Sequence, residues 1–348
     1  MSETIAPRLK VTPDPIMTEK VGRDCLDLGQ FLSGFYNLPT LLSTFLLPPS
    51  SFLFPSSFFL LPASSKATSS ALTQLSQKSS KINTIIFCFY LAMNPYTILN
   101  ETQRQRTSDR ATVPILSNCE SANRLLILIW SQLGDFDSLE YAWWLQREAA
   151  QLKSKGIVIR AVGIGDRNSG LKFCDYTGFP PEWLFVDPTA ELHQELELYS
   201  GLSLKFPGLS PEQNAWINLM LMCAGIASPG TLAEVFRGYR GDRLAPQLID
   251  DQETIKAAPL PALKGSFFNL AGGTGFQRPF ELATLRLRNM TEVLGNWKTY
   301  VPNAAYMTQR GATFLFDGQG KLLYEHRDRG ILGFAENMSR PLSFLSMT

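Results

Sequence analysis

Thiol and imidazole groups are the side chains of this sequence best suited to nucleophilic, redox or metal chemistry. Its cysteines lie far apart and form no Cys-x-x-Cys pair, so neither a zinc knuckle nor a dithiol redox motif is supported. They are Cys25, Cys88, Cys119, Cys174 and Cys223. Only two histidines, His193 and His326, are present, which argues against a histidine-rich metal site. We expect no metal and no cofactor.

Two other catalytic motifs are incomplete. The glycine-rich stretch Ala271–Gly275 (AGGTG) lacks the Gly-Lys-Ser/Thr ending of a phosphate-binding loop and opens no strand-helix-strand unit. The Gly-x-Ser-x-Gly turn that exposes a serine nucleophile does not occur. Neither phosphate binding nor serine-hydrolase chemistry is therefore supported.

The elements that would position these side chains alternate between strand and helix from residue 125 onward. Leu125–Trp130 (LLILIW) and Ile157–Ile164 (IVIRAVGI) are continuous apolar runs, typical of strands buried on both faces. Between them, Asp137–Lys155 carries apolar residues at helical spacing, and Gly156 ends it. This order predicts a βαβ unit with a parallel pair of strands.

Further elements complete the expected domain. They are a helix around Ser169–Thr177, a strand over Trp183–Val186, a helix over Thr189–Tyr199 capped by Thr189, and the strands Thr313–Phe316 and Lys321–His326. The turn Asp317-Gly-Gln-Gly320 joins the last two strands as an antiparallel hairpin. The sequence therefore predicts an α/β fold with a mixed sheet flanked by helices.

The segment 202–300 interrupts this alternation. Ser210-Pro211 and Ser228-Pro229 are each typical of a helix start, with serine as cap and proline in the first turn. A third helix follows Arg278-Pro279 and ends near Leu294. We interpret the segment as a helical insertion.

Residues 1–92 differ in composition from the rest. Leu41–Pro62 is apolar and about long enough to span a bilayer, but its prolines disfavour a transmembrane helix. Acidic residues are absent between Asp27 and Glu101 and serine is abundant, which is typical of a transit segment, although residues 1–27 contain acids. Alternatively, translation begins at Met93. In either case we expect 1–92 to be a low-complexity, poorly ordered extension and 93–345 to be the folded domain.

Bulk composition sets wide bounds on function. The 348 residues are 45% apolar and 18% charged with a net charge of +1, which fits a folded protein of about two units. No global charge favours nucleic acid or a membrane surface. The unpaired cysteines favour a reducing compartment, so we expect the cytoplasm, or the plastid if residues 1–92 are a transit segment.

Three segments carry a shared pattern. They are Gly156–Asp166 (GIVIRAVGIGD), Phe173–Leu192 (FCDYTGFPPEWLFVDPTAEL) and Gly311–Gly330 (GATFLFDGQGKLLYEHRDRG). Together they resemble the peroxiredoxin-like branch of the alkyl-hydroperoxide-reductase/thiol-antioxidant (AhpC/TSA) family. The resemblance covers Tyr96–Phe334 and is weaker within Leu202–Tyr300. It implies a thioredoxin-like fold and a thiol-dependent antioxidant activity.

The resemblance also implies where an active site would lie. In this family, Pro-x-x-x-Thr/Ser-x-x-Cys opens the helix after the first core strand, where backbone N–H groups stabilise a thiolate. Here Ser131 stands at the proline position, Asp135 at the threonine and Ser138 at the cysteine. A thiol pKa of about 8.5 can fall by several units, but an alcohol starts near that of water, about 15.7, and forms no sulfenic acid. We interpret the three positions as vestigial, with Asp135, Asp137 and Ser138 serving as ordinary helix-start residues.

Two further candidates remain within the resembling segments. Cys174 is the surviving candidate for a catalytic thiol; the alternative is a small buried apolar residue. Arg310 stands where peroxiredoxins often place an arginine that pairs with thiolate and peroxide. Pointing inward, it would bind a small anion or pair with Asp135. The alternative for Arg310 is a solvated arginine at a strand end.

The other cysteines and histidines have weaker cases. Cys119 precedes the first core strand as a candidate exposed thiol, and Cys223 is expected in the core. His326 is either a general base or, as we favour, a hydrogen-bonded surface histidine. His193 lies on a short amphipathic helix without catalytic company.

Two functions are therefore open. The first is a binding or redox-associated module that has lost peroxidase chemistry and meets a protein partner through the insertion, by way of Trp216, Phe236, Tyr239 and Trp297. The second is a thiol-dependent antioxidant enzyme that uses Cys174. No nucleic acid and no stable membrane span are expected, and the oligomeric state is open.

Overall fold

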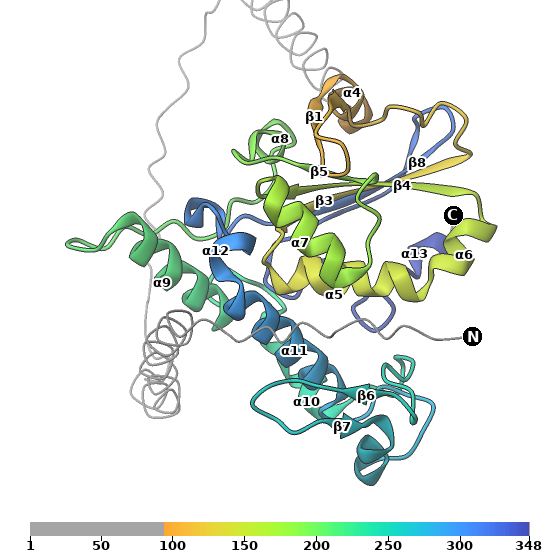
Figure 1. The fold of residues 1–348 in the computed structure, drawn as a ribbon, viewed down its shortest axis with the longest axis vertical. Helices are drawn as coiled ribbons and strands as arrows, with labels where there is room; N and C mark the ends of the chain where they lie inside the picture. Colours follow the sequence, from red (N-terminus) through yellow and green to blue (C-terminus); the bar gives the residue numbers. More distant parts are fainter. Residues whose placement is uncertain (1–93, 348) are drawn as a thin grey trace, which may run out of the picture. The chain divides into compact units, whose positions relative to one another are not determined.

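A seven-stranded mixed sheet organises the computed structural model, which describes residues 94–347 (Figure 1). The strand order is β2-β1-β5-β4-β3-β8-β9. The bounds are β1 Gln103–Arg106, β2 Thr112–Pro114, β3 Arg124–Gln132, β4 Ile157–Ile164, β5 Leu184–Val186, β8 Ala312–Asp317 and β9 Leu322–Arg327. Strands β3, β4 and β5 are parallel, and β8 is antiparallel to its two neighbours, β3 and β9. The predicted α/β fold with a thioredoxin-like mixed sheet is confirmed.

Two helices, not one, connect β3 to β4. They are α5 (Phe136–Arg147) and α6 (Ala149–Ser154), so the prediction of one continuous helix over Asp137–Lys155 is wrong. The helix is interrupted at Glu148, whose φ of −96° and ψ of 12° are not helical. The apolar pattern of the sequence does not reveal this break, because Leu152, which follows it, is also buried.

Both faces of the sheet are covered, which explains why the central strands are apolar throughout. Alternate residues of β3 point to opposite faces. Leu126, Leu128 and Trp130 belong to a core shared with α5 and α7 (Arg167–Thr177). Leu125, Ile127 and Ile129 belong to a second core, shared with α4 (Pro95–Glu101) and α8 (Glu191–Glu195).

Helix α8 is shorter than the predicted Thr189–Tyr199 and is not capped by Thr189. Its N-cap is Ala190, at a φ of 53° and without a side-chain cap. The Thr189 hydroxyl donates instead to Asp187 at 3.3 Å. The backbone N–H of Leu192 also donates to Asp187, at 2.9 Å. A residue just after strand β5 therefore fulfils the role that the sequence assigns to Thr189.

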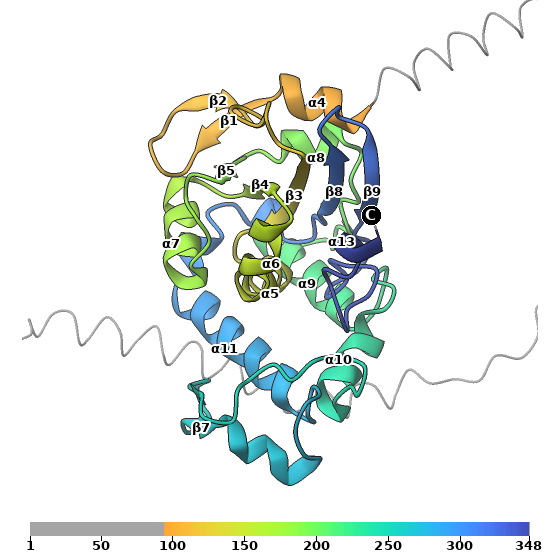
Figure 2. The same cartoon turned by 90° about the vertical axis from the view of Figure 1, so that its right-hand side faces the viewer.

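The predicted insertion contains most of the remaining elements. They are α9 Pro211–Cys223, α10 Thr231–Arg240, β6 Thr254–Ile255, β7 Leu263–Lys264, the 3-10 helix η2 Gly265–Ala271, α11 Glu281–Gly295 and α12 Trp297–Tyr300, followed by η3 Ala304–Tyr306 and α13 Phe344–Met347. Figures 1 and 2 show α10, α11 and β7 on the side of the sheet that α5 covers. Ser210 caps α9 as predicted, in a capping box with Gln213. Helix α10 instead begins after Gly230, because the Ser228 hydroxyl is engaged with Thr231 and with the backbone of Ile331.

None of the helices within residues 94–347 combines the length and apolar character needed to cross a membrane. The predicted extension 1–92, including Leu41–Pro62, lies outside the described residues.

Candidate functional site

The three residues that the sequence singled out, Ser131, Asp135 and Ser138, come together where β3 ends and α5 begins. Ser131 is the penultimate residue of β3, and Ser138 lies in the first turn of α5. Asp135 is the N-cap of α5, and its Oδ1 accepts a hydrogen bond from the N–H of Asp137 at 3.1 Å. A carboxylate therefore occupies the positive end of this helix, which is where the family motif places a thiolate.

The Ser138 hydroxyl is enclosed and already hydrogen-bonded. The residue is 1% exposed, and its Oγ donates to the carbonyl oxygen of Gln132 at 3.1 Å. The Ser131 Oγ lies 3.2 Å from the Ser138 Oγ. Because the proton of Ser138 is directed at Gln132, the Ser131 hydroxyl is the donor between the two serines. These contacts fix the two hydroxyl groups and leave the Ser138 oxygen unactivated.

The side chain of Arg310, which is distant in the sequence, lies at the N-terminus of α5. It is 0% exposed and forms ion pairs with Asp135, 175 residues away, and with Asp137, whose Oδ2 lies 3.3 Å from Nη1. Its Nε also donates to the carbonyl of Thr308 at 3.2 Å. The pairing with Asp135 that the sequence suggested is therefore present, and the alternative of a solvated strand-end arginine is wrong.

Gly311 explains how Arg310 can approach so closely. A Cβ at this position would lie 2.1 Å from the carbonyl oxygen of Ile129 in β3, a distance that real Cβ atoms do not reach. Only glycine allows the backbone just before β8 to pack against β3 this closely. The preceding residue, Arg310, is thereby placed at the N-terminus of α5.

The charges of this cluster are strongly perturbed by burial. Asp137 is 2% exposed, and both of its carboxylate oxygens lie 2.9 Å from the N–H of Leu332. Burial, followed by the charge of Asp135, raises the pKa of Asp137 well above its ordinary value. Burial alone would lower the pKa of Arg310, but the charges of Asp135 and Asp137 outweigh it, so that pKa is raised. One cation is thus surrounded by carboxyl groups, which opposes binding of an anion.

The space beside the cluster is very small. A cavity of about 10 Å³ is lined by Ser131, Asp137 and Ser138 from one side and by Thr313 and Asp328 from the other. About 10–15 Å³ is the least that holds one water molecule. An organic hydroperoxide does not fit there.

The thiols within residues 94–347 lie in environments that disfavour the thiolate. Cys174, in α7, is 8% exposed, and burial followed by the charge of Glu182 raises its pKa to about 12. Cys119 is buried rather than exposed, and burial raises its pKa as well. Cys223 is half-buried rather than fully in the core, with a pKa raised by burial to about 11. A nucleophilic cysteine has the opposite character.

We expect alkylation of Cys174 in the native protein to be slow. A pKa of about 12 in place of 9.0 lowers the thiolate fraction at pH 8 about a thousandfold, and burial slows access further. Peptide mass spectrometry after timed iodoacetamide treatment measures the rate, with guanidinium-unfolded protein as the control. Labelling of native and unfolded Cys174 at similar rates would contradict this structural account of the thiol.

The two histidines differ in their surroundings. His193 is 0% exposed, and its Nε2 donates to the carbonyl of Trp130 at 2.9 Å. Burial lowers the pKa of His193 to about 4, so the ring is neutral at pH 7. His326 is partly exposed and donates from Nε2 to the carbonyl of Gly333 at 2.8 Å, as expected of a hydrogen-bonded surface histidine. The full burial of His193 beneath β3 is not apparent in its amphipathic pattern.

The insertion is tied to the domain by a charge network that the sequence pattern did not reveal. Arg286 of α11 forms ion pairs with Glu140 of α5 at 2.7 Å and with Glu234 of α10 at 2.6 Å. The one feature of the sequence that could have indicated this network is Glu140, a carboxylate among the apolar residues of α5 that face the core.

The four aromatic residues proposed for docking divide into two pairs. Trp216 and Trp297 stack on each other at 4.6 Å and pack against the main core. Phe236 and Tyr239, both on α10, are half-exposed. The second pair is therefore the more exposed of the two.

No curated protein matches the chain. Residues 144–330, more than half of the 348-residue chain, match the sequence model of the AhpC/TSA antioxidant enzyme family. The matched region begins just after Ser138 and includes β4, β5, the insertion, β8 and β9. The chain therefore belongs to the AhpC/TSA antioxidant enzyme family.

Proposed function

We propose that this protein has lost the peroxidase chemistry of its family and acts as a binding module. One observation carries the proposal: at the N-terminus of α5, a buried arginine is held by Asp135 and Asp137 where a peroxide and a thiolate would have to meet. A thiolate is anionic and a peroxide accepts hydrogen bonds, so both would need the guanidinium of Arg310 as a partner. That guanidinium is already paired with the carboxylates of Asp135 and Asp137. Peroxide would have to displace a buried ion pair to enter.

The chemistry of the altered motif supports the same conclusion. In a peroxiredoxin, the thiolate attacks one peroxide oxygen, the O–O bond breaks, the alcohol or water leaves, and sulfur is oxidised to sulfenic acid. Ser138 cannot carry this oxidation. Because the family match begins at Trp144, the assignment of Ser138 to the thiol position rests on the spacing from Ser131 and on its place in the first turn of α5.

Binding would take place through the insertion. Phe236 and Tyr239 present half-exposed rings on α10, and Arg286 fixes that helix to α5 and α11 through Glu140 and Glu234. A surface held in this way is pre-organised, which limits the entropy lost on binding. The free thiols of the described residues fit a reducing compartment, the cytoplasm, or the plastid if residues 1–92 are a transit segment.

The test is hydroperoxide consumption by the full chain in the presence of glutathione or thioredoxin. We expect a rate equal to that of buffer for the wild type. Ser138→Cys is a useful second protein, because the new thiol would be enclosed beside two carboxyl groups that raise its pKa. We expect no turnover from it either. Turnover by Ser138→Cys would show that the pocket remains competent and that only the sulfur was lost.

A further inference from the structure

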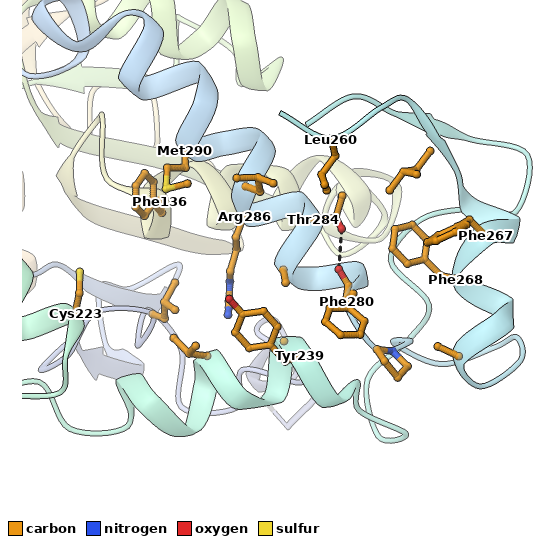
Figure 3. A pocket seen from close by; sticks show the side chains of 18 of the residues that line it. Phe136, Cys223, Tyr239, Leu260, Phe267, Phe268, Phe280, Thr284, Arg286 and Met290 are labelled. Atoms are coloured by element: carbon orange, nitrogen blue, oxygen red, sulfur yellow. Dashed lines mark hydrogen bonds between the residues drawn. The ribbon is translucent and has the colours of Figure 1, made fainter. Parts of the chain in front are cut away.

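A large cavity lies between the insertion and the N-terminal end of α5, next to the cluster at Arg310, because Phe136 and Leu332 also line it. Its volume is about 940 Å³, within the range of about 300–1,000 Å³ that is usual for small-molecule sites. Helix α10, helix α11 and the segment 260–271 form its walls (Figure 3). Figure 3 shows Tyr239, Phe280 and Phe267 entering it from these three segments. Most of the lining side chains are aliphatic or aromatic.

Three of the polar groups that line this cavity, on Thr231, Thr284 and Arg286, are already engaged by the protein. The Thr231 hydroxyl donates to the carbonyl of Ile331 at 2.8 Å, and the Thr284 hydroxyl donates to that of Phe280 at 2.9 Å. The charge of Arg286 is compensated by Glu140 and Glu234. No charge on the wall therefore demands a counter-charge, and the part of an occupant that enters must be apolar and uncharged.

The mouth of the cavity exposes apolar surface to an unusual degree. Five of the twelve large apolar side chains that are exposed within residues 94–347 line this one cavity. They are Tyr239, Leu260, Phe267, Leu270 and Phe280, between 42% and 85% exposed. Scattered exposed apolar residues are ordinary, but a gathered set around a concave surface marks a binding site.

Phe280 adds an independent observation. Its φ of 66° places a bulky aromatic residue in the left-handed region, which is a strained conformation for any residue but glycine and rare outside asparagine and aspartate. It is the N-cap of α11 and makes no side-chain cap. Its ring instead meets that of Tyr239 edge-on at 6.0 Å across the mouth. The strained backbone of Phe280 therefore does not serve to cap the helix; it positions the aromatic ring at the mouth of the cavity.

We propose that this cavity binds one small hydrophobic molecule with an extended uncharged hydrocarbon body, a long chain or a fused-ring system, whose polar end stays at the mouth. The inference gives the ligand class for the binding function proposed above, and it does not depend on the state of the Ser138 site. The neutral, concave and aromatic interior favours such a ligand over a protein surface, since protein interfaces carry polar rims and hydrogen bonds.

The experiment uses the full chain, first stripped of bound lipid on a lipophilic resin, and the neutral fluorescent rod diphenylhexatriene as the probe. We expect saturable binding at one probe per chain, with displacement by octadecanol. Ala283 lines the cavity, and Ala283→Trp fills it, so we expect at least a tenfold loss of affinity. The matched control is Ala233→Trp on the outer side of α10, which is exposed and does not line the cavity; it should bind as the wild type does.

A second variant separates binding from folding. Phe280→Gly removes the ring and relieves the backbone strain, so affinity should fall about tenfold while the melting temperature stays the same or rises. Absence of saturable binding to the wild type, or equal binding by Ala283→Trp, would overturn the proposal. So would a dimer that Ala283→Trp converts to monomer, because a second copy would then be the occupant. Peroxide turnover is measured separately, so failure of this inference and failure of the lost-peroxidase proposal are distinguishable.

Discussion

Replacing Arg310 by methionine is expected to lower the free energy of unfolding by about 3–5 kcal/mol. The guanidinium is 0% exposed and is the counter-charge of both Asp135 and Asp137. Its removal leaves two carboxyl groups at a buried helix start without a cation, and methionine fills much of the volume without restoring charge balance. Urea denaturation at pH 7 measures the loss.

Two further variants test whether the loss of stability is caused by the missing charge. Adding Asp135→Asn and Asp137→Asn to Arg310→Met should recover most of the lost stability, because the buried site is then neutral. Arg310→Lys should be intermediate, since a lysine keeps the charge but cannot reach both carboxylates with one planar group. If Arg310→Met alone reduced stability by less than about 1 kcal/mol, as an exposed pair would, the cluster would not be the closed ionic site described above.

The second large effect is a change in the pH dependence of stability, caused by His193. Its pKa is lowered by burial to about 4 in the folded chain, against about 6.5 when unfolded. Between these values the unfolded chain binds a proton and the folded chain does not. Stability is therefore complete above about pH 6.5 and is lost as the pH falls toward 4, by on the order of 3 kcal/mol. In His193→Gln, which keeps a donor for the Trp130 carbonyl and does not titrate, this loss should vanish.

The measurement compares unfolding free energies of His193→Gln and the wild type from pH 7 to pH 4.5. Asp137, Asp328 and His326 also have raised pKa values in the folded chain, and they titrate in both proteins. Taking the difference between the two curves removes their contribution, so what remains belongs to position 193. Two parallel curves would mean that the buried imidazole is not the group that couples folding to protons here.

The fold could be predicted well from sequence where structure depends on nearby residues. Continuous apolar runs predicted β3 and β4, and the Ser210-Pro211 pair predicted the start of α9. Helix starts were wrong where the expected cap residue was engaged elsewhere or a neighbouring residue accepted the hydrogen bonds in its place. Ser228 binds the backbone of Ile331. Asp187, just after a strand, holds the start of α8.

The same distinction holds for the candidate site. Ser131, Asp135 and Ser138 come together because one strand-turn-helix segment carries all three. The partner of Asp135 lies 175 residues away, so the sequence could offer it only as one of three alternatives. The burial of His193, the Arg286 network and the cavity at Phe280 each depend on how α8, α10 and α11 pack, which periodicity does not encode.

We propose that a buried ion cluster has replaced peroxide chemistry in this member of the AhpC/TSA family. The most direct test of this proposal is hydroperoxide turnover by the purified full chain with thiol donors, measured in parallel for Cys174→Ser. The account predicts that both proteins consume peroxide no faster than buffer. Robust turnover by the wild type that disappears in Cys174→Ser would contradict it and would assign the activity to the buried thiol of α7.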